Sequence, residues 1–368
     1  MKKVLFNCST NIQGGAAQNA ANFILSSQND QDIEFHYLVS EPVKLIVEHF
    51  QKNMKNMHII SQSPSKNLKS RITIGSIEKN ISPDLVYTMA GPAYVDFKSI
   101  HVMGCSNPYV IFASKQDMKF GRSNYEYIKR YLNTFYQNFY IKNADYFIFQ
   151  TRSSAEKFAQ KFKITAEKYS YIPNSIGVTK QYENECPSAA DSTLKILCPF
   201  ENYAHKGIHI LPSLGKKLHR KGLDFKIIST NDPNKNLKKE ILRLGLTDRF
   251  EFIGKQRYEN MAENYMKSSI VFMPSILEIF SSICIEALYF RKPLVVADRS
   301  FNREITEKYA FYCDPYFIDS CEEAIMKANE KVHDDDYLDE AKEFILSKYG
   351  EYNDRFNSIR KILIGLIK

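Results

Sequence analysis

The chain has 368 residues, which at ~150 residues per domain predicts about two domains. Its 44% hydrophobic and 25% charged residues are typical of a soluble globular protein and exclude wholesale disorder or a collagen-like fibre. No apolar run reaches the ~18–20 residues of a membrane-spanning helix, and residues 1–15 are too short and too polar for a signal peptide. We therefore expect a cytoplasmic location.

In the first half of the chain, short β-branched runs alternate with longer amphipathic runs. Strands are predicted at residues 3–8, 34–39, 84–89, 100–103 and 146–150, and helices at residues 16–28, 42–52 and 122–142. Strands alternating with helices are typical of βαβ units around a parallel sheet. This half is predicted to be a Rossmann-like domain.

The alternation restarts after residues 182–192, a polar stretch that indicates a linker or surface loop. Strands are predicted at residues 194–199, 225–229, 250–253, 270–273 and 293–296, and helices at residues 208–221, 237–244, 260–267 and 282–290. Residues 337–368 are predicted to be helical, with a break at Tyr349–Gly350. The predicted fold class is α/β, with two doubly wound domains facing a cleft and the site at the carboxyl ends of the strands.

Seven cysteines, an odd number without a C-x-x-C pair, indicate small core residues in a reducing compartment rather than disulfides. The net charge is +8, and residues 98–170 hold 12 Lys/Arg against 5 Asp/Glu, or +7. Aromatic residues are interleaved in the same segment, which favours an anionic partner such as an acidic membrane surface or a phosphorylated lipid. The alternative is an ordinary amphipathic helix whose aromatic residues face the core.

The pattern with the clearest chemistry is E-I-F-S-S-I-C-I-E, from Glu278 to Glu286. It follows a predicted strand and opens a predicted helix, so Ser281 and Ser282 lie near the positive N-terminal end, where a diphosphate fits. Glu286 suits the two vicinal hydroxyls of a ribose, and Glu278 suits the hydroxyls of a sugar. Alternatively, both are surface acids at a helix start.

Three weaker signals lie at other strand ends. Lys206-Gly207 precedes a predicted helix, where a cation can face a phosphate, and Gly14-Gly15 follows the first strand without forming G-x-G-x-x-G. His101 is expected at the carboxyl end of its strand, facing the cleft. Each signal has a structural alternative. Lys206 would be a solvated lysine, Gly14-Gly15 a structural glycine turn, and His101 a core histidine whose hydrogen bonds are satisfied.

The acidic run Asp334-Asp335-Asp336 contains a D-x-D spacing, but its place at a helix start favours N-capping over a metal role. No His/Cys/Asp set has metal-ligand spacing, so neither a metal nor a cofactor is expected.

Together these residues resemble glycosyltransferase family 4, retaining enzymes of the GT-B architecture found in bacterial polysaccharide synthesis. The E-x7-E signature corresponds to Glu278 and Glu286, and the K-G pair to Lys206-Gly207. The glycine-rich first turn corresponds to Gly14-Gly15, and the hinge motif to residues 172–175. The resemblance covers essentially the whole chain and is most specific at residues 194–304.

Three positions depart from the family pattern. Phe200 occupies the place of an arginine, so half of the usual cationic clamp on the diphosphate is missing unless Arg257 or Lys255 compensates. Arg291 and Ser175 each replace a glycine. These changes bear on the donor more than on the fold.

The resemblance implies transfer of a sugar from a nucleotide-sugar donor to a hydroxyl acceptor, with retention and without a metal. It implies His101, Glu278 and Lys206 as catalytic residues. The implied donor-binding residues are Gly14, Gly15, Lys206, Phe280, Ser281, Ser282 and Glu286. The expected domains are residues 1–173 for the acceptor, residues 174–345 for the donor, and a C-terminal helix, 346–368, that packs on the first.

The basic segment suggests a lipid-linked saccharide acceptor, and hence a peripheral enzyme on the inner face of the plasma membrane, without a nucleic-acid partner. Two other functions remain open: a sugar-nucleotide 2-epimerase, and a non-catalytic subunit that binds a nucleotide sugar. A nicotinamide oxidoreductase is disfavoured because G-x-G-x-x-G is absent.

Overall fold

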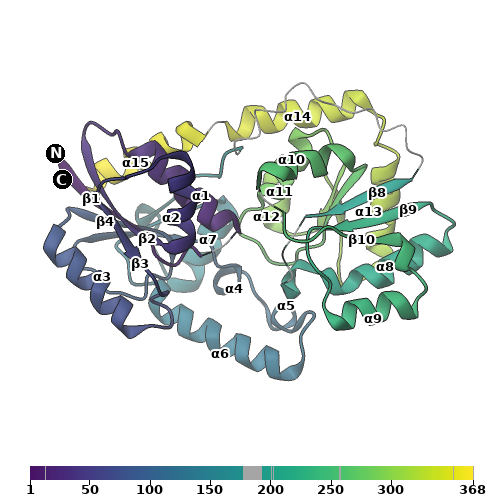
Figure 1. Ribbon diagram of the computed structural model, residues 1–368, viewed down its shortest axis with the longest axis horizontal. Helices are drawn as coiled ribbons and strands as arrows, with labels where there is room; N and C mark the ends of the chain where they lie inside the picture. The colour runs from purple at the N-terminus through teal and green to yellow at the C-terminus, as the bar shows by residue number, and fades with distance from the viewer. Residues whose placement is uncertain are drawn as a thin grey trace. The chain divides into compact units, whose positions relative to one another are not determined.

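The computed structural model describes the chain except for Gln13, residues 177–192, Phe200, Asn202, Arg257, Glu351 and Lys368, and except for the side chains of Tyr258, Glu259 and Tyr352. The predicted linker at 182–192, Cys186 and the substitution at Phe200 thus lie outside the described residues. Two compact units result (Figure 1). The first unit comprises Met1–Phe112, Ile128–Ser175 and Glu351–Lys368, and the second comprises Ala113–Tyr127 and Ile176–Gly350.

The first unit is built on a seven-stranded parallel sheet of order β3-β2-β1-β4-β5-β6-β7. Its strands are β1 (Lys2–Cys8), β2 (Ile33–Ser40), β3 (Met57–Ile60), β4 (Leu85–Gly91), β5 (Ile100–Cys105), β6 (Tyr146–Phe149) and β7 (Tyr169–Tyr171). The interior strand β1 is buried from Val4 to Cys8 and apolar there except for Asn7, as a parallel strand covered on both faces requires.

Helices cover both faces of this sheet. The helices are α1 (Gly14–Ser27), α2 (Glu41–Phe50), α3 (Leu68–Ile81), α4 (Pro108–Ile111), α6 (Asn124–Ile141, whose first turn the second unit holds), α7 (Arg152–Phe162), η1 (Ala166–Lys168) and α15 (Tyr352–Leu366). Alternate residues of β1 serve the two cores: Val4 and Phe6 pack with α1, α2 and α15, whereas Leu5 packs with Ile74 of α3.

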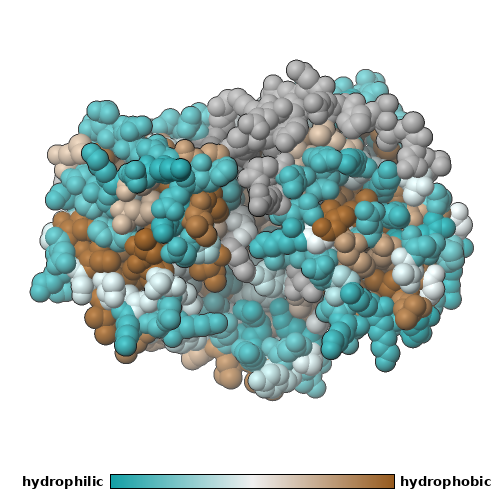
Figure 2. Space-filling view, in the orientation of Figure 1, coloured by the Kyte–Doolittle hydropathy of each residue, from teal (hydrophilic) through white to brown (hydrophobic). Residues whose placement is uncertain are grey.

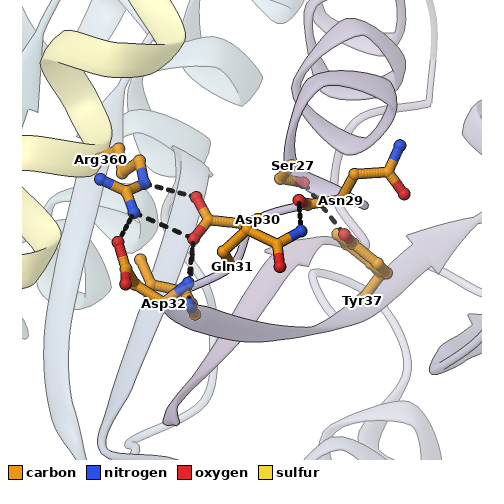
Figure 3. A network of polar contacts seen from close by, with 8 residues as sticks. Ser27, Asn29, Asp30, Gln31, Asp32, Tyr37 and Arg360 are labelled. Carbon is orange, nitrogen blue, oxygen red and sulfur yellow. Dashed lines mark hydrogen bonds and ion pairs between the residues drawn. The ribbon is translucent and has the colours of Figure 1, made fainter.

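The C-terminal helix α15 packs on α1 and is held by an ionic contact as well as by its apolar face. Phe356 of α15 lies edge-on against Phe23 of α1, with 5.3 Å between ring centroids. Arg360 forms ion pairs with Asp30 and Asp32 in the turn before β2 (Figure 3). Burial raises the pKa of Asp30, but hydrogen bonds from Arg360 and from backbone amides outweigh it and leave that pKa below its ordinary value.

The second unit has a six-stranded parallel sheet of order β10-β9-β8-β11-β12-β13. Its strands are β8 (Leu194–Cys198), β9 (Phe225–Ser229), β10 (Phe250–Phe252), β11 (Ile270–Met273), β12 (Leu294–Ala297) and β13 (Phe311–Cys313). Its helices are α5 (Lys115–Lys119), η3 (Ala204–Lys206), η4 (Ile208–Ile210), α8 (Leu211–Arg220), α9 (Lys235–Arg243), η5 (Thr247–Arg249), α10 (Tyr258–Lys267), α11 (Ser282–Tyr289), α12 (Ser300–Thr306), α13 (Ile318–Asn329) and α14 (Asp335–Tyr349). One core cluster unites residues of α10, α11 and α14 with β11 and β12.

The predicted fold class is confirmed: the chain forms two parallel-sheet, Rossmann-like α/β units. The predicted break in the C-terminal helix falls at Gly350, between α14 and α15. The sequence did not predict β3, α3, α7, β7, α12, β13 and α13. Among the described residues, no helix combines the length and the hydrophobicity that crossing a membrane requires.

The six cysteines that the structure describes are all free and buried, as expected for core residues.

Candidate functional site

The second sheet changes direction between β8 and β11. Strands that follow β8 in the sequence extend one way, and strands that follow β11 extend the other way. Open α/β sheets bind ligands at such a switch point, beyond the carboxyl ends of the strands. Lys206 and Gly207 follow β8, and Glu278 follows β11, so these residues flank the switch point.

The two loops at the switch point are joined. Lys206 Nζ forms an ion pair with Glu278 Oε1, although 72 residues separate the two in the sequence. The side chains are only 16% and 12% exposed, so water screens this pair less than it screens a surface pair. The backbone N–H of Ile276 also donates to the carbonyl of His205 at 3.0 Å. The loops therefore form one surface with a cation and a carboxylate at its centre.

Gly207 permits this close approach. Its φ of +81° is in the left-handed region, and a Cβ atom there would lie 3.0 Å from Pro274 Cγ and 3.2 Å from the Pro274 carbonyl oxygen. A side chain at this position would therefore strain the backbone and push the two loops apart.

We expect Gly207→Ala to lower the free energy of unfolding by more than the about 1–2 kcal/mol that left-handed backbone costs an L-residue. Gly222→Ala is the matched control, because Gly222 has a φ of +73° with nothing within 4 Å of its Cβ position. Denaturant unfolding of both variants measures the difference. Equal losses would show that Pro274 does not crowd position 207.

Helix α11 begins between Glu278 and Glu286 and presents its N-terminus at the same edge. Ser281 is the N-cap residue, but its hydroxyl donates to Met273 Sδ at 3.0 Å and does not cap the helix. The first-turn N–H groups and the helix dipole therefore suit an anionic ligand. Ser282 is exposed, whereas the Phe280 ring packs edge-on against Tyr349, with centroids 5.6 Å apart. The Phe280 ring is therefore part of the core of the second unit.

Glu286 lies one turn into α11 and is buried. The Tyr265 hydroxyl of α10 donates to Glu286 Oε2 at 2.8 Å. Burial raises the pKa of Glu286 above its ordinary value, and hydrogen bonds from Tyr265 and Ser282 offset only part of that effect. Because the Glu286 carboxylate is buried, any further hydrogen bond that a ligand donates to it would stabilise its charged form.

Cys284, a buried thiol in the first turn of α11, lies between Glu278 and Glu286 in the sequence. Burial raises the pKa of Cys284, the negative charges of Glu278 and Glu286 raise it further, and a hydrogen bond with Ser281 and the Lys206 cation lower it. Lys206 and Glu278 are in direct contact, and Glu286 lies on the helix that follows Glu278.

Gly14 and Gly15 belong to the first unit. They open α1 directly after β1, at the carboxyl edge of the first sheet, and both are exposed. Gly14 has a φ of +59°, and nothing lies within 4 Å of a Cβ atom built on either residue. The turn leaves the backbone accessible, as close approach of a ligand would require.

The predicted position of His101 is wrong. It is the second residue of β5, at the amino end of the strand rather than the carboxyl end, because the apolar run continues to Cys105. Its Nδ1 lies 3.0 Å from the Asn143 carbonyl, which can only accept, so Nδ1 carries the hydrogen. Nε2 then accepts from the Thr88 hydroxyl at 2.9 Å, and Thr88 accepts from Asn7 Nδ2 at 3.2 Å.

Burial lowers the pKa of His101 to about 4, so the imidazole is neutral at pH 7. Both ring nitrogens form their hydrogen bonds within the fold. His101 therefore matches the alternative given above, a core histidine whose hydrogen bonds are all satisfied. We do not include His101 in the proposed mechanism.

The N-capping prediction for Asp334 is confirmed. Its side chain accepts from the backbone N–H of Tyr337 at 3.1 Å, and Asp335 pairs with Arg291 at 2.7 Å. In the described part of the chain, no group of three or more His, Cys, Asp or Glu side chains could hold a metal ion.

Sequence reasoning missed a segment that lies beside the Lys206 loop. Residues 113–127 belong to the second unit, where the Phe120 ring contacts both His209 and Tyr316, with centroids 4.5 and 5.0 Å apart. A Cβ atom on Gly121 would lie 2.7 Å from the His209 ring, and Asp117 accepts from the Tyr316 hydroxyl at 2.9 Å. The capping box formed by Ser114 and Asp117 is a local sequence pattern that could have predicted the start of α5 in this segment.

The sequence named Lys255 and Arg257 as cations that could compensate for Phe200. Lys255 lies exposed in the loop after β10, and Arg257 is outside the described residues.

Comparison with known proteins agrees with this geometry. Residues 188–343, which carry Lys206, Glu278 and Glu286, match the family "Glycosyl transferases group 1". The matched range is less than half of the chain and falls within the second unit. A comparison with curated proteins found no match.

Solved structures share the fold over the full length. Anabaena Alr3699/HepE, solved with UDP and glucose, superposes with a TM-score of 0.73 at 16% identity and covers 100% of both chains. A glycosyltransferase from Rickettsia africae has a TM-score of 0.72 at 16% identity over 100% of this chain and 99% of its own. WaaG, a glycosyltransferase involved in lipopolysaccharide biosynthesis, has a TM-score of 0.71 at 12% identity over 98% and 99%. The two units thus have the fold of GT-B glycosyltransferases.

Proposed function

We propose that the protein is a retaining glycosyltransferase of family 4 that moves a sugar from a nucleoside-diphosphate sugar to a hydroxyl acceptor. The observation that carries this proposal is the Lys206–Glu278 pair, which lies at the switch point of a sheet whose sequence matches group 1 glycosyltransferases. The complex of HepE with UDP-glucose supports a nucleotide-sugar donor.

In this proposal the donor replaces Glu278 as the partner of Lys206. Lys206 and the first-turn amides of α11 hold the diphosphate, Glu286 accepts hydrogen bonds from the ribose, and Glu278 accepts from the sugar hydroxyls. The ion pair with Glu278 holds the Lys206 side chain at the switch point. A lysine held in this way loses little further rotamer entropy when it binds a diphosphate.

The proposed chemistry breaks the bond between the anomeric carbon and the diphosphate oxygen and forms one to the acceptor oxygen. Negative charge grows on the leaving diphosphate as its bond breaks. Lys206 and the α11 N-terminus are in place to stabilise that charge. The leaving phosphate itself takes the acceptor proton, so no side chain is assigned as nucleophile or base.

The acceptor in this proposal is a lipid-linked saccharide, and the product a surface polysaccharide such as O-antigen or capsule. The +7 charge of residues 98–170 supports an acceptor that carries a diphosphate and lies at an anionic membrane. The enzyme then works in the cytoplasm, peripherally on the inner membrane face.

A panel of nucleotide sugars, each incubated with and without membrane lipid extract, tests the proposal. A transferase releases nucleoside diphosphate only when the acceptor is present, and the product keeps the anomeric configuration of the donor. Turnover of the donor alone to an epimer would indicate the 2-epimerase. Binding without turnover under any condition would indicate the non-catalytic subunit.

We expect the reaction to be independent of metal. The Lys206 cation and the helix N-terminus can stabilise the leaving group directly, so activity is expected to survive EDTA. The rate before and after chelation measures this. A loss that Mn²⁺ restores would contradict the prediction and point to Asp334 and Asp336.

A further inference from the structure

Helix α6 carries an apolar stripe that faces solvent. Among its most exposed residues are Tyr125 at 74% and Phe135 at 72%. The members of the stripe recur at intervals of three and four residues and are all exposed: Tyr125, Ile128, Leu132, Phe135 and Phe139. Tyr131 widens it. Tyr136 and Tyr140 instead pack inward against the buried Tyr94, with ring centroids 5.8 and 5.4 Å apart, so the sequence alternative holds for these two residues but not for the stripe. Large exposed apolar patches mark interaction surfaces.

The opposite face of α6 anchors the helix. Thr134 and Ile141 are buried, Gln137 accepts from Asn107 Nδ2 at 2.8 Å, and Arg130 lies over the Tyr109 ring at 4.4 Å. The helix is therefore docked through its less apolar side. Figure 1 draws α6 along the lower edge, where hydrophobic side chains appear in Figure 2.

The surroundings of this stripe within the first unit are basic. Residues 128–175 hold 8 Lys/Arg against 3 Asp/Glu, a net charge of +5. Helix α7 lies beside α6, since Lys161 Nζ is 3.5 Å from Asn138 Oδ1. The exposed cations nearest in sequence are Lys129 of α6 and Lys142 just beyond its end.

We propose that α6 lies in the interface of an anionic lipid bilayer, with the stripe inserted among the lipids and the neighbouring cations on the headgroups. Phenylalanine and tyrosine are favoured at this depth, and interfacial helices combine such an apolar face with lysine and arginine. The inference deepens the proposed function, because it names the surface that brings a lipid-linked acceptor to the enzyme.

A second copy of the chain is the other candidate occupant of the stripe. Pairing two copies through α6 would bring two basic surroundings together, and like charges at close range repel. An anionic bilayer attracts the same charges. The charge distribution therefore favours the membrane over self-association.

Vesicle co-sedimentation tests the inference with the full chain and no donor, so its outcome does not depend on transferase activity. The vesicles are phosphatidylcholine alone, or phosphatidylcholine with phosphatidylglycerol. We expect binding to the anionic vesicles that weakens in high salt, because surface charges are screened within ~8–10 Å at 0.1–0.15 M ionic strength.

The double variant Leu132→Ser/Phe135→Ser is expected to bind anionic vesicles at least about tenfold more weakly, because two large apolar side chains no longer enter the bilayer. Leu45→Ser/Phe50→Ser is the matched control: it changes the same residue types on α2 of the same unit, at 61% and 58% exposure. The control is expected to bind like the wild type. Circular dichroism and UDP binding verify that both variants fold.

Equal binding to neutral and anionic vesicles would overturn the inference, as would equal losses in the two double variants. A third result would also overturn it: sedimentation velocity shows that the wild type is a dimer, Leu132→Ser/Phe135→Ser is a monomer, and the wild type does not bind vesicles. If the protein binds anionic vesicles as expected but turns over no nucleotide sugar, the inference that α6 binds membranes is retained and the proposed reaction is wrong.

Discussion

Lys206→Ala is expected to lower kcat/KM for the nucleotide-sugar donor by roughly 10–150-fold, through a lower kcat and a higher donor KM. A hydrogen bond to a charged group contributes about 1.5–3 kcal/mol, and here the charge on the leaving diphosphate grows towards the transition state. The variant also leaves Glu278, only 12% exposed, without its cation. Steady-state kinetics with varied donor measures both parameters.

Lys217→Ala is the matched control for this variant. Lys217 also pairs with a carboxylate of the second unit, that of Asp319, but the pair is far more exposed. Such surface pairs contribute about 0–1 kcal/mol, so we expect wild-type kinetics and stability. If folded Lys206→Ala keeps the wild-type kcat and donor KM, the donor does not bind at the β8–β11 switch point.

Glu286→Gln is expected to raise donor KM by roughly tenfold with little change in kcat. Glutamine keeps the shape of the side chain and can still accept from Tyr265, but its hydrogen bonds to the ribose lose their charge. Because the ribose lies away from the reacting carbon, the loss is the same in the ground state and the transition state. A fall in kcat at unchanged KM would instead place Glu286 at the reaction centre.

The same variant is expected to be at least as stable as the wild type at pH 7. Burial raises the pKa of Glu286, so the folded state prefers the protonated carboxyl. The free energy of unfolding of the wild type therefore falls as pH rises from the ordinary glutamate pKa to the raised pKa of folded Glu286. Below the ordinary pKa the wild type loses no stability from this group. Denaturant unfolding of both proteins at pH 7.5 and pH 5 measures their free energies of unfolding. We expect the difference between the variant and the wild type to be smaller at pH 5.

Glu322→Gln provides the control for this stability effect. Glu322 is also buried in the second unit, but Lys221 lies 2.7 Å from its carboxylate. Its loss removes a partner from an ion pair, so we expect lower stability and an unchanged donor KM. Two buried glutamates should thus shift stability in opposite directions. Destabilisation by Glu286→Gln as large as that by Glu322→Gln would contradict the account.

The sequence predicted five of the six strands of the second sheet, because these apolar strands are short and bounded by clear loops. Helix α11 was expected at residues 282–290 and spans Ser282–Tyr289. Lys206 and Glu278 follow β8 and β11, which are neighbours in the sheet but not in the sequence. Their pairing and the burial of Glu286 against Tyr265 depend on contacts distant in sequence, which no local pattern encodes.

Other features could not be read from local patterns. The three-to-four-residue spacing on α6 is the same whether its aromatic residues face the core or solvent, and only the fold shows that Phe135 and Phe139 face solvent while Tyr136 and Tyr140 pack against Tyr94. His101 was assigned to the carboxyl end of a strand whose predicted start, residue 100, already made it the second residue, and in β5 it lies at the amino end. The short strand β13 offers three residues, too few for a periodic signal.

Arg291 shows how a departure from a family pattern is accommodated. It follows α11 with a φ of +55°, the left-handed conformation for which helix ends favour glycine. Its guanidinium pairs with Asp335 and Asp339 of α14, at 2.7 and 2.8 Å. These contacts offset part of the conformational cost and attach the end of α11 to α14.

The most direct test of the central claim is a crystal structure of the protein with the nucleoside diphosphate that binds most tightly among UDP, GDP, ADP and dTDP. The account predicts the diphosphate at Lys206 Nζ and the backbone amides of Ser281 and Ser282, with the ribose hydroxyls on Glu286. A nucleotide bound elsewhere, with the Lys206–Glu278 pair intact, would contradict it.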